Sequence, residues 1–86
     1  MYVVVRLRKI THYYNKLGVA TIEVEHGRLQ KGDHIHIVGH STDFEQTVES
    51  MELQHQQIIE AREGQDVGVE VEDYVRENDF VYKSHI

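Results

Sequence analysis

The chain has 86 residues, no cysteine and a formal net charge of −6 at pH 7. This length suits a single domain covering residues 1–86, and the lack of cysteine excludes disulfides, zinc–thiolate sites and thiol nucleophiles. No apolar run reaches the ~18 residues of a membrane helix, and no basic segment precedes an apolar run of signal length, so we expect a cytoplasmic protein without membrane contact. The acidic balance also disfavours non-specific binding to nucleic acid.

The first half of the chain has the pattern of short β-strands separated by turns, because segments rich in Val, Ile and Tyr alternate with glycine- and aspartate-bearing turns. We expect strands at 2–14 and 19–24, joined by a turn in which Gly18 suits a positive φ. In the second strand alternate residues are apolar and face the core: Ala20, Ile22 and Val24. A third strand is expected at 34–38, after a loop in which Leu29 is the apolar anchor.

The next segment allows two interpretations. As a strand, residues 44–55 need a bulge or bend near 49–50, because Val48 is out of phase with Met51. As a helix, residues 46–61 would use apolar residues spaced three apart, but a polar run interrupts that spacing. The strand is the favoured interpretation.

Two further strands complete the expected fold. The fifth is expected at 66–71, with valines at alternate positions, and the last at 80–83 after a loop. Six strands in so small a domain need their edges covered. The sequence therefore predicts an all-β fold, a closed six-stranded antiparallel β-barrel filled by its own side chains.

Several segments resemble known barrel domains. The segment LQKGDHIHI at 29–37 resembles the L-x-x-G-D-x-I/V-x-I/V segment of domain 2 in translation GTPases such as elongation factor Tu, and AREGQDVG at 61–68 and RENDFV at 76–81 resemble later parts of that domain. THYYNKLGVA at 11–20 and GHSTDF at 39–44 are more similar to the C-terminal barrel of collagenase-like peptidases and to small translation elongation factor-like proteins. The resemblance covers about residues 8–83 and implies a barrel of the translation-factor domain 2 type.

The chain also departs from these families. Val71-Glu72-Asp73 stands where translation GTPases tend to carry L-R-G, and acids there would repel a phosphate backbone. Asn78 stands where glycine is usual, a mild change because asparagine tolerates the left-handed conformation. No G-x-x-x-x-G-K-[ST] segment is present, so we expect no GTP binding.

The histidines at 34 and 36 raise the question of a metal site. Residues i and i+2 of a strand share a face, so His34 and His36 point together, and His26 or His40 could supply a third ligand. However, Ile35 and Ile37 need the core, which places the histidines on the solvent face. A structural zinc site also needs four supported ligands, so we expect neither metal nor cofactor.

Paired carboxylates occur on two strands and raise the question of acid–base catalysis. Glu23 and Glu25 share one strand face, and Glu70 and Glu72 share another. On strands whose opposite face is apolar, such pairs are usually the wet face of the sheet. Neither a cleft-forming insertion nor a nucleophile motif is present, so we expect no catalytic residues and no enzyme.

The beginning of the chain mixes bases with aromatic residues, a combination that can follow phosphates and stack on bases. Residues 1–31 hold six Lys/Arg against two acids, whereas residues 32–86 hold three against thirteen. The alternative is a first strand with a solvated face and core tyrosines. The candidate contact residues for RNA or a partner, including the histidine face, are Arg6, Arg8, Lys9, Tyr13, Tyr14, Lys16, His34 and His36.

Two functions remain open at this point. The first is a non-catalytic binding module of translation-factor type, linked to RNA or the translation machinery. The second is a protein-docking accessory subunit for a peptidase-like or RNA-modifying enzyme. The partner is therefore either RNA or a protein, and the sequence leaves the oligomeric state open, since an edge near residues 2–5 could pair with another chain.

Overall fold

The computed structural model describes residues 3–85, with side chains described from Lys9 to Ser84. Within this range the chain forms strands and no helix, so the helical alternative for residues 46–61 is wrong. The described strands are β1 (Val3–Tyr14), β2 (Val19–Val24), β3 (Arg28–Gln30), β4 (His34–Val38), β5 (Asp43–Thr47), β6 (Met51–Leu53), β7 (Gln56–Ile58), β8 (Glu60–Arg62), β9 (Asp66–Glu70) and β10 (Phe80–His85).

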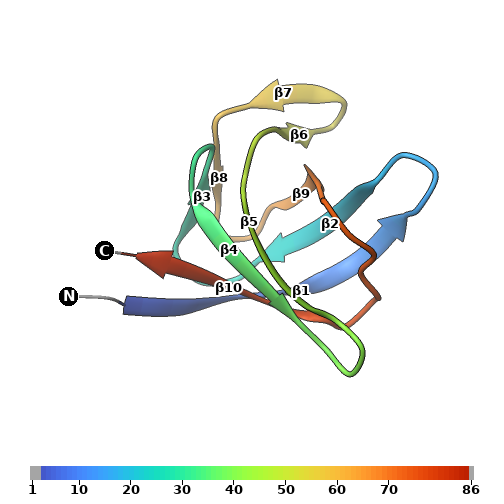
Figure 1. The fold of residues 1–86 in the computed structure, drawn as a ribbon. Helices are drawn as coiled ribbons and strands as arrows, with labels where there is room; N and C mark the ends of the chain where they lie inside the picture. Colours follow the sequence, from blue (N-terminus) through green and yellow to red (C-terminus); the bar gives the residue numbers. More distant parts are fainter. Residues whose placement is uncertain (1–2, 86) are drawn as a thin grey trace.

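Eight strands form one antiparallel sheet in the order β5-β4-β10-β1-β2-β9-β6-β7, and β3 pairs with β8 separately. The large sheet curls around the core as a half-barrel (Figure 1). The expected closed six-stranded barrel is therefore wrong, because the outermost strands β5 and β7 are not hydrogen-bonded to each other. The all-β class and most strand positions are confirmed.

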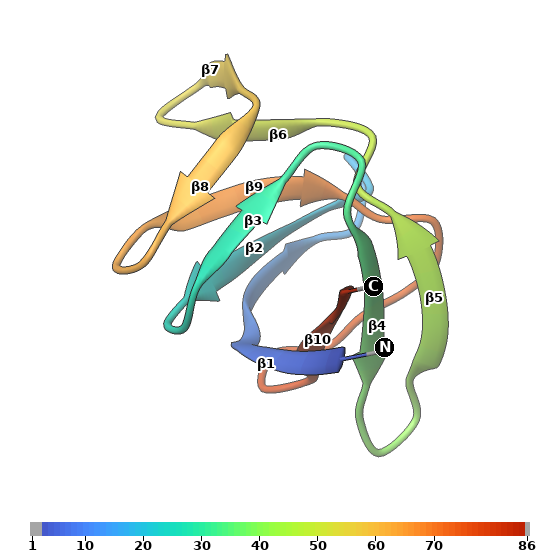
Figure 2. The ribbon, with the colours of Figure 1, turned by 90° about the vertical axis from the view of Figure 1, so that its left-hand side faces the viewer.

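The β3–β8 ribbon covers the open side of the sheet. Figure 2 shows these two short strands side by side, crossing over β2 and β9. Leu29 and Ala61, which are cross-strand partners in the ribbon, are both fully buried. Leu29 is thus the apolar anchor that the sequence predicted, although it lies in a strand and not in a loop. Backbone hydrogen bonds join the adjoining residues to the link between β5 and β6: Gly32 N to Val48 O at 2.8 Å and Val48 N to Asp33 O at 2.8 Å.

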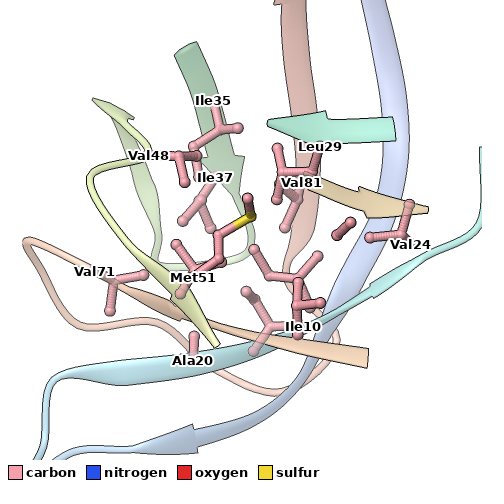
Figure 3. Packing of buried hydrophobic residues seen from close by; sticks show 14 of the residues in the cluster. Ile10, Ala20, Val24, Leu29, Ile35, Ile37, Val48, Met51, Val71 and Val81 are labelled. Atoms are coloured by element: carbon pink, nitrogen blue, oxygen red, sulfur yellow. The ribbon is translucent and has the colours of Figure 1, made fainter. Parts of the chain in front are cut away.

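The core consists of apolar side chains at alternate strand positions (Figure 3). The predicted core face of β2 is confirmed, as is that of β4, where Ile35 and Ile37 are fully buried. Val48 is also buried, and it lies where the chain leaves β5 and bends before β6 begins at Met51. The predicted interruption near residues 49–50 is therefore present.

Irregularities in β1 determine which side chains face outward. Register shifts occur between Arg6 and Arg8 and between Ile10 and His12. An extra residue in one strand reverses the facing of the residues that follow. Tyr13 consequently pairs with buried Ala20 and packs against the core, although it is three residues after buried Ile10.

Positive φ angles occur at predicted turn positions. Gly18 has φ +67° in the β1–β2 turn and Asn78 has φ +76° before β10. Asparagine therefore adopts the left-handed conformation at the position where related barrels carry glycine. The described chain offers no helix with the length and apolar character needed to cross a membrane.

Candidate functional site

The outer face of β4 and β5 carries two histidine–carboxylate pairs. His34 Nε2 lies 2.6 Å from Glu45 Oε1, and His36 Nε2 lies 2.5 Å from Asp43 Oδ1. The register pairs His36 directly with Glu45, so each histidine contacts a carboxylate diagonally across the hairpin. The prediction that the two histidines share the outward face is confirmed.

This arrangement gives two separate pairs. Among the side chains that the structure describes, from Lys9 to Ser84, no group of three or more His, Cys, Asp or Glu is placed to hold a metal ion. His26, one of the proposed third ligands, lies 3.9 Å from Glu25, and His40 is exposed in the β4–β5 turn. The outer face of β4 and β5 therefore carries two polar side-chain pairs.

The candidates from β1 are spread along the strand. The side chains of Arg6 and Arg8 lie outside the described part of the chain. The register nevertheless places Arg6, Tyr82 and His36 in one row across β1, β10 and β4. Lys9 lies opposite Glu23 of β2, so at least one predicted base is next to an acid.

The remaining candidates lie at the β1–β2 turn. Tyr13 contacts the ring of Tyr74 edge-on with centroids 6.1 Å apart, while Tyr14 contacts the His12 ring at 4.3 Å. Tyr14 is 49% exposed, and Lys16 is exposed in the turn. The structure thus brings Tyr14 and Lys16 together at this turn.

The predicted contact residues are consequently spread over different parts of the sheet. His34 and His36 lie on β4, which β10 separates from β1. Tyr14 is the last residue of β1 and Lys16 lies in the turn that follows, beyond both register shifts. RNA contact along the whole set stays a prediction.

A hollow that the sequence analysis missed lies beside Tyr14 on the sheet surface. It has a volume of about 370 Å³ and is bordered by the β1–β2 turn and the β6–β7 turn, with Gly68 of β9 and Thr21 of β2 among its lining residues. One signal for it was present in the sequence. Gly68 takes an outward position in the middle of β9, where a side chain is expected, and glycine inside a strand often marks close approach of another group.

Comparisons with known proteins show that the chain is similar to parts of proteins named as peptidases. No protein-family model matches the chain. An uncharacterized protease of Methanocaldococcus jannaschii is 38% identical over 79 residues, which cover 91% of this chain and 19% of that protein. A collagenase of Porphyromonas gingivalis is 38% identical over 72 residues, covering 83% of this chain and 20% of the collagenase. The chain therefore spans about a fifth of the length of these relatives.

A solved structure confirms the architecture. The C-terminal domain of a putative U32 peptidase from Geobacillus thermoleovorans superposes with a TM-score of 0.82, over 90% of this chain and 89% of that domain, at 20% sequence identity. At this identity the match shows the fold. The peptidase part of the predicted resemblance is supported, whereas these comparisons do not support the translation-factor part.

Proposed function

We propose that the chain is a non-catalytic accessory domain of a peptidase-like protein, acting by docking to protein. One observation carries the proposal. Nearly the whole chain is 38% identical to a stretch that makes up only about a fifth of a protease and of a collagenase. A domain of this size is thus one part of those larger proteins, most of whose length this chain does not match.

The chemistry of the described surface supports a docking role. Acidic side chains lie at outward strand positions, and the two histidines of β4 are each engaged by a carboxylate of β5. Each of these contacts uses one ring nitrogen, Nε2, of an exposed or half-buried histidine. Polar rows of this kind suit the rim of a protein interface.

A chimera tests the proposal. The stretch of the Porphyromonas gingivalis collagenase that matches this chain is replaced by the chain, and collagen cleavage is compared among the parent, the chimera and a variant lacking the stretch. Because Val3 pairs with His85, the described chain begins and ends side by side, so both junctions lie at one place. We expect the chimera to cleave collagen faster than the deletion variant.

The isolated chain is the matched control for catalysis. We expect it to leave collagen and gelatin intact at the concentration at which the chimera is active. Cleavage by the isolated chain would show that it is catalytic. A folded chimera no more active than the deletion variant would contradict the accessory role.

A further inference from the structure

A groove lies on the outer surface of the large sheet, where β2, β9 and β6 are neighbours. The turn between β1 and β2 and the turn between β6 and β7 form its rims, and Figure 1 shows both turns on the right-hand side of the molecule. We call it the Gly68 groove. Its volume of about 370 Å³ is at the small end of the ~300–1,000 Å³ range of ligand pockets, which suits one or two side chains.

The floor of the groove is Gly68, at a position whose backbone conformation does not require glycine. Gly68 is in the middle of β9, between Thr21 of β2 and Glu52 of β6, and it is not among the residues with positive φ. Glycine within a strand costs roughly 0.5–1 kcal/mol relative to alanine. A Cβ at this position would lie 3.3 Å from Val19 Cγ1 and would fill the floor. The missing side chain therefore leaves space on an otherwise regular strand.

One rim is apolar and exposed. Leu17 in the β1–β2 turn is 72% exposed, and Tyr14 beside it is 49% exposed. Val19 continues this apolar surface to the floor. An alkyl chain entering the groove would be covered by these side chains.

The other rim is a turn with unusual residues. Gln54 and His55 have φ +51° and +65°, and they join Leu53 to Gln56, which are paired across the β6–β7 hairpin. A two-residue turn with two positive φ angles favours Asn-Gly, because other side chains crowd the backbone there. The turn keeps Gln and His at this cost, and both line the groove.

The charge of the groove is negative. Glu52 and Asp66 line it, and no lysine or arginine does. Among the described residues, neither carboxylate takes part in an ion pair. A phosphate backbone would be repelled here, whereas a cation on an alkyl stem would meet both the apolar rim and the acids.

We propose that the Gly68 groove docks a basic, partly apolar peptide segment of a partner protein. An arginine or lysine stem lies over Gly68 against the rim of Tyr14 and Leu17, and its charged end meets Glu52 and Asp66. This inference rests on the accessory function proposed above and adds the chemistry of the docked surface.

Peptide titration of the full chain tests the groove directly. The probe is acetyl-Leu-Arg-Leu-Arg-Leu-amide, and its charge-reversed control is acetyl-Leu-Glu-Leu-Glu-Leu-amide. Binding is followed by the amide chemical shifts of Leu17, His55 and Gly68. We expect the arginine peptide to move these shifts saturably and the glutamate peptide to leave them unchanged.

Two double variants with equal charge loss separate the groove from general attraction. Glu52→Gln with Asp66→Asn should weaken binding of the arginine peptide at least about fivefold. Glu49→Gln with Glu72→Gln, at exposed positions outside the groove, should change it less than about twofold. Gly68→Ala should also weaken binding by filling the floor, and the charge variants keep the test valid if Gly68→Ala does not fold.

Three results would contradict docking of a basic peptide in the Gly68 groove. Absence of binding by the arginine peptide, equal loss in the two double variants, or shifts of the same amides by a ten-nucleotide uridine RNA would each overturn the groove proposal. The collagenase chimera distinguishes the two proposals, because a chimera carrying Glu52→Gln with Asp66→Asn that keeps full activity contradicts only the groove.

Discussion

The open side of the half-barrel is bridged in two places by different interactions. Near the first residues of β9, the β3–β8 ribbon bridges the open side and buries Leu29 and Ala61. Where β9 ends, Gln46 of β5 bridges it with its side-chain amide. Gln46 Nε2 donates to Glu70 O at 2.8 Å, and Glu72 N donates to Gln46 Oε1 at 2.8 Å.

These two bridges differ in what they tolerate. Apolar burial has no preferred direction, so it depends on the volume of the side chain and survives a change of shape. A buried amide stabilises through hydrogen bonds, which are directional, and removing the amide leaves its partner groups without a hydrogen bond. Gln46 is 4% exposed, and its amide engages one backbone carbonyl and one backbone N–H. The ribbon should therefore be sensitive to side-chain size and the Gln46 bridge to hydrogen-bonding capacity.

The largest effect is expected from Leu29→Ala. Removing a fully buried leucine side chain costs about 2–5 kcal/mol of unfolding free energy, a large share of the ~5–15 kcal/mol typical of small domains. Urea denaturation measures the loss. Leu29→Met, which preserves volume, should cost less than about 1.5 kcal/mol. Equal losses for the two variants would contradict a ribbon held by packing.

Gln46→Ala should cost about 1–3 kcal/mol, because two backbone groups lose their partner. Urea denaturation again measures the loss, with Gln57→Ala as the control for an exposed glutamine, expected within about 0.5 kcal/mol of the parent. Hydrogen exchange adds a local readout, since the Glu72 amide should exchange faster in Gln46→Ala than in the parent. An unchanged rate at Glu72 would show that this amide does not depend on Gln46.

The sequence predicted the large sheet better than either bridge. Apolar residues alternate in β2, β4 and β9, so their inward faces and their positions could be inferred. The strands β3 and β8 have three residues each and one buried side chain each, which is too short for a period to show. Gln46 is polar at an inward position, and only the tertiary structure reveals its partners.

The candidate site divides in the same way. The shared face of His34 and His36 follows from strand alternation alone. Their contacts with Glu45 and Asp43 depend on the register of the β4–β5 hairpin, which the sequence pattern did not specify. Predicting the Gly68 groove would have required the tertiary structure, because the groove lies between two turns that are distant in sequence.

Lys83→Met should weaken the ribbon by about 1 kcal/mol. Lys83 Nζ donates to Arg28 O at 2.6 Å and lies 3.5 Å from Asp33 Oδ2, with 14% of its side chain exposed. Methionine keeps much of the apolar stem and removes the donor. Urea denaturation at low and high salt measures the loss, which should shrink as salt rises. A loss as large as that of Leu29→Ala would mean that polar contacts, and not packing, hold the ribbon.

The smallest effect is expected for the ion pair within the ribbon. Arg28 Nη1 lies 2.9 Å from Glu60 Oε1, but 63% of the arginine side chain is exposed. Exposed pairs contribute about 0.2–1 kcal/mol, so a double-mutant cycle with Arg28→Ala and Glu60→Ala should give a coupling below about 0.5 kcal/mol. Because this pair joins the same two strands as Leu29 and Ala61, the cycle compares charge with packing at one location. A coupling above the loss in Lys83→Met would reverse the order and make surface charge the main tie between β3 and β8.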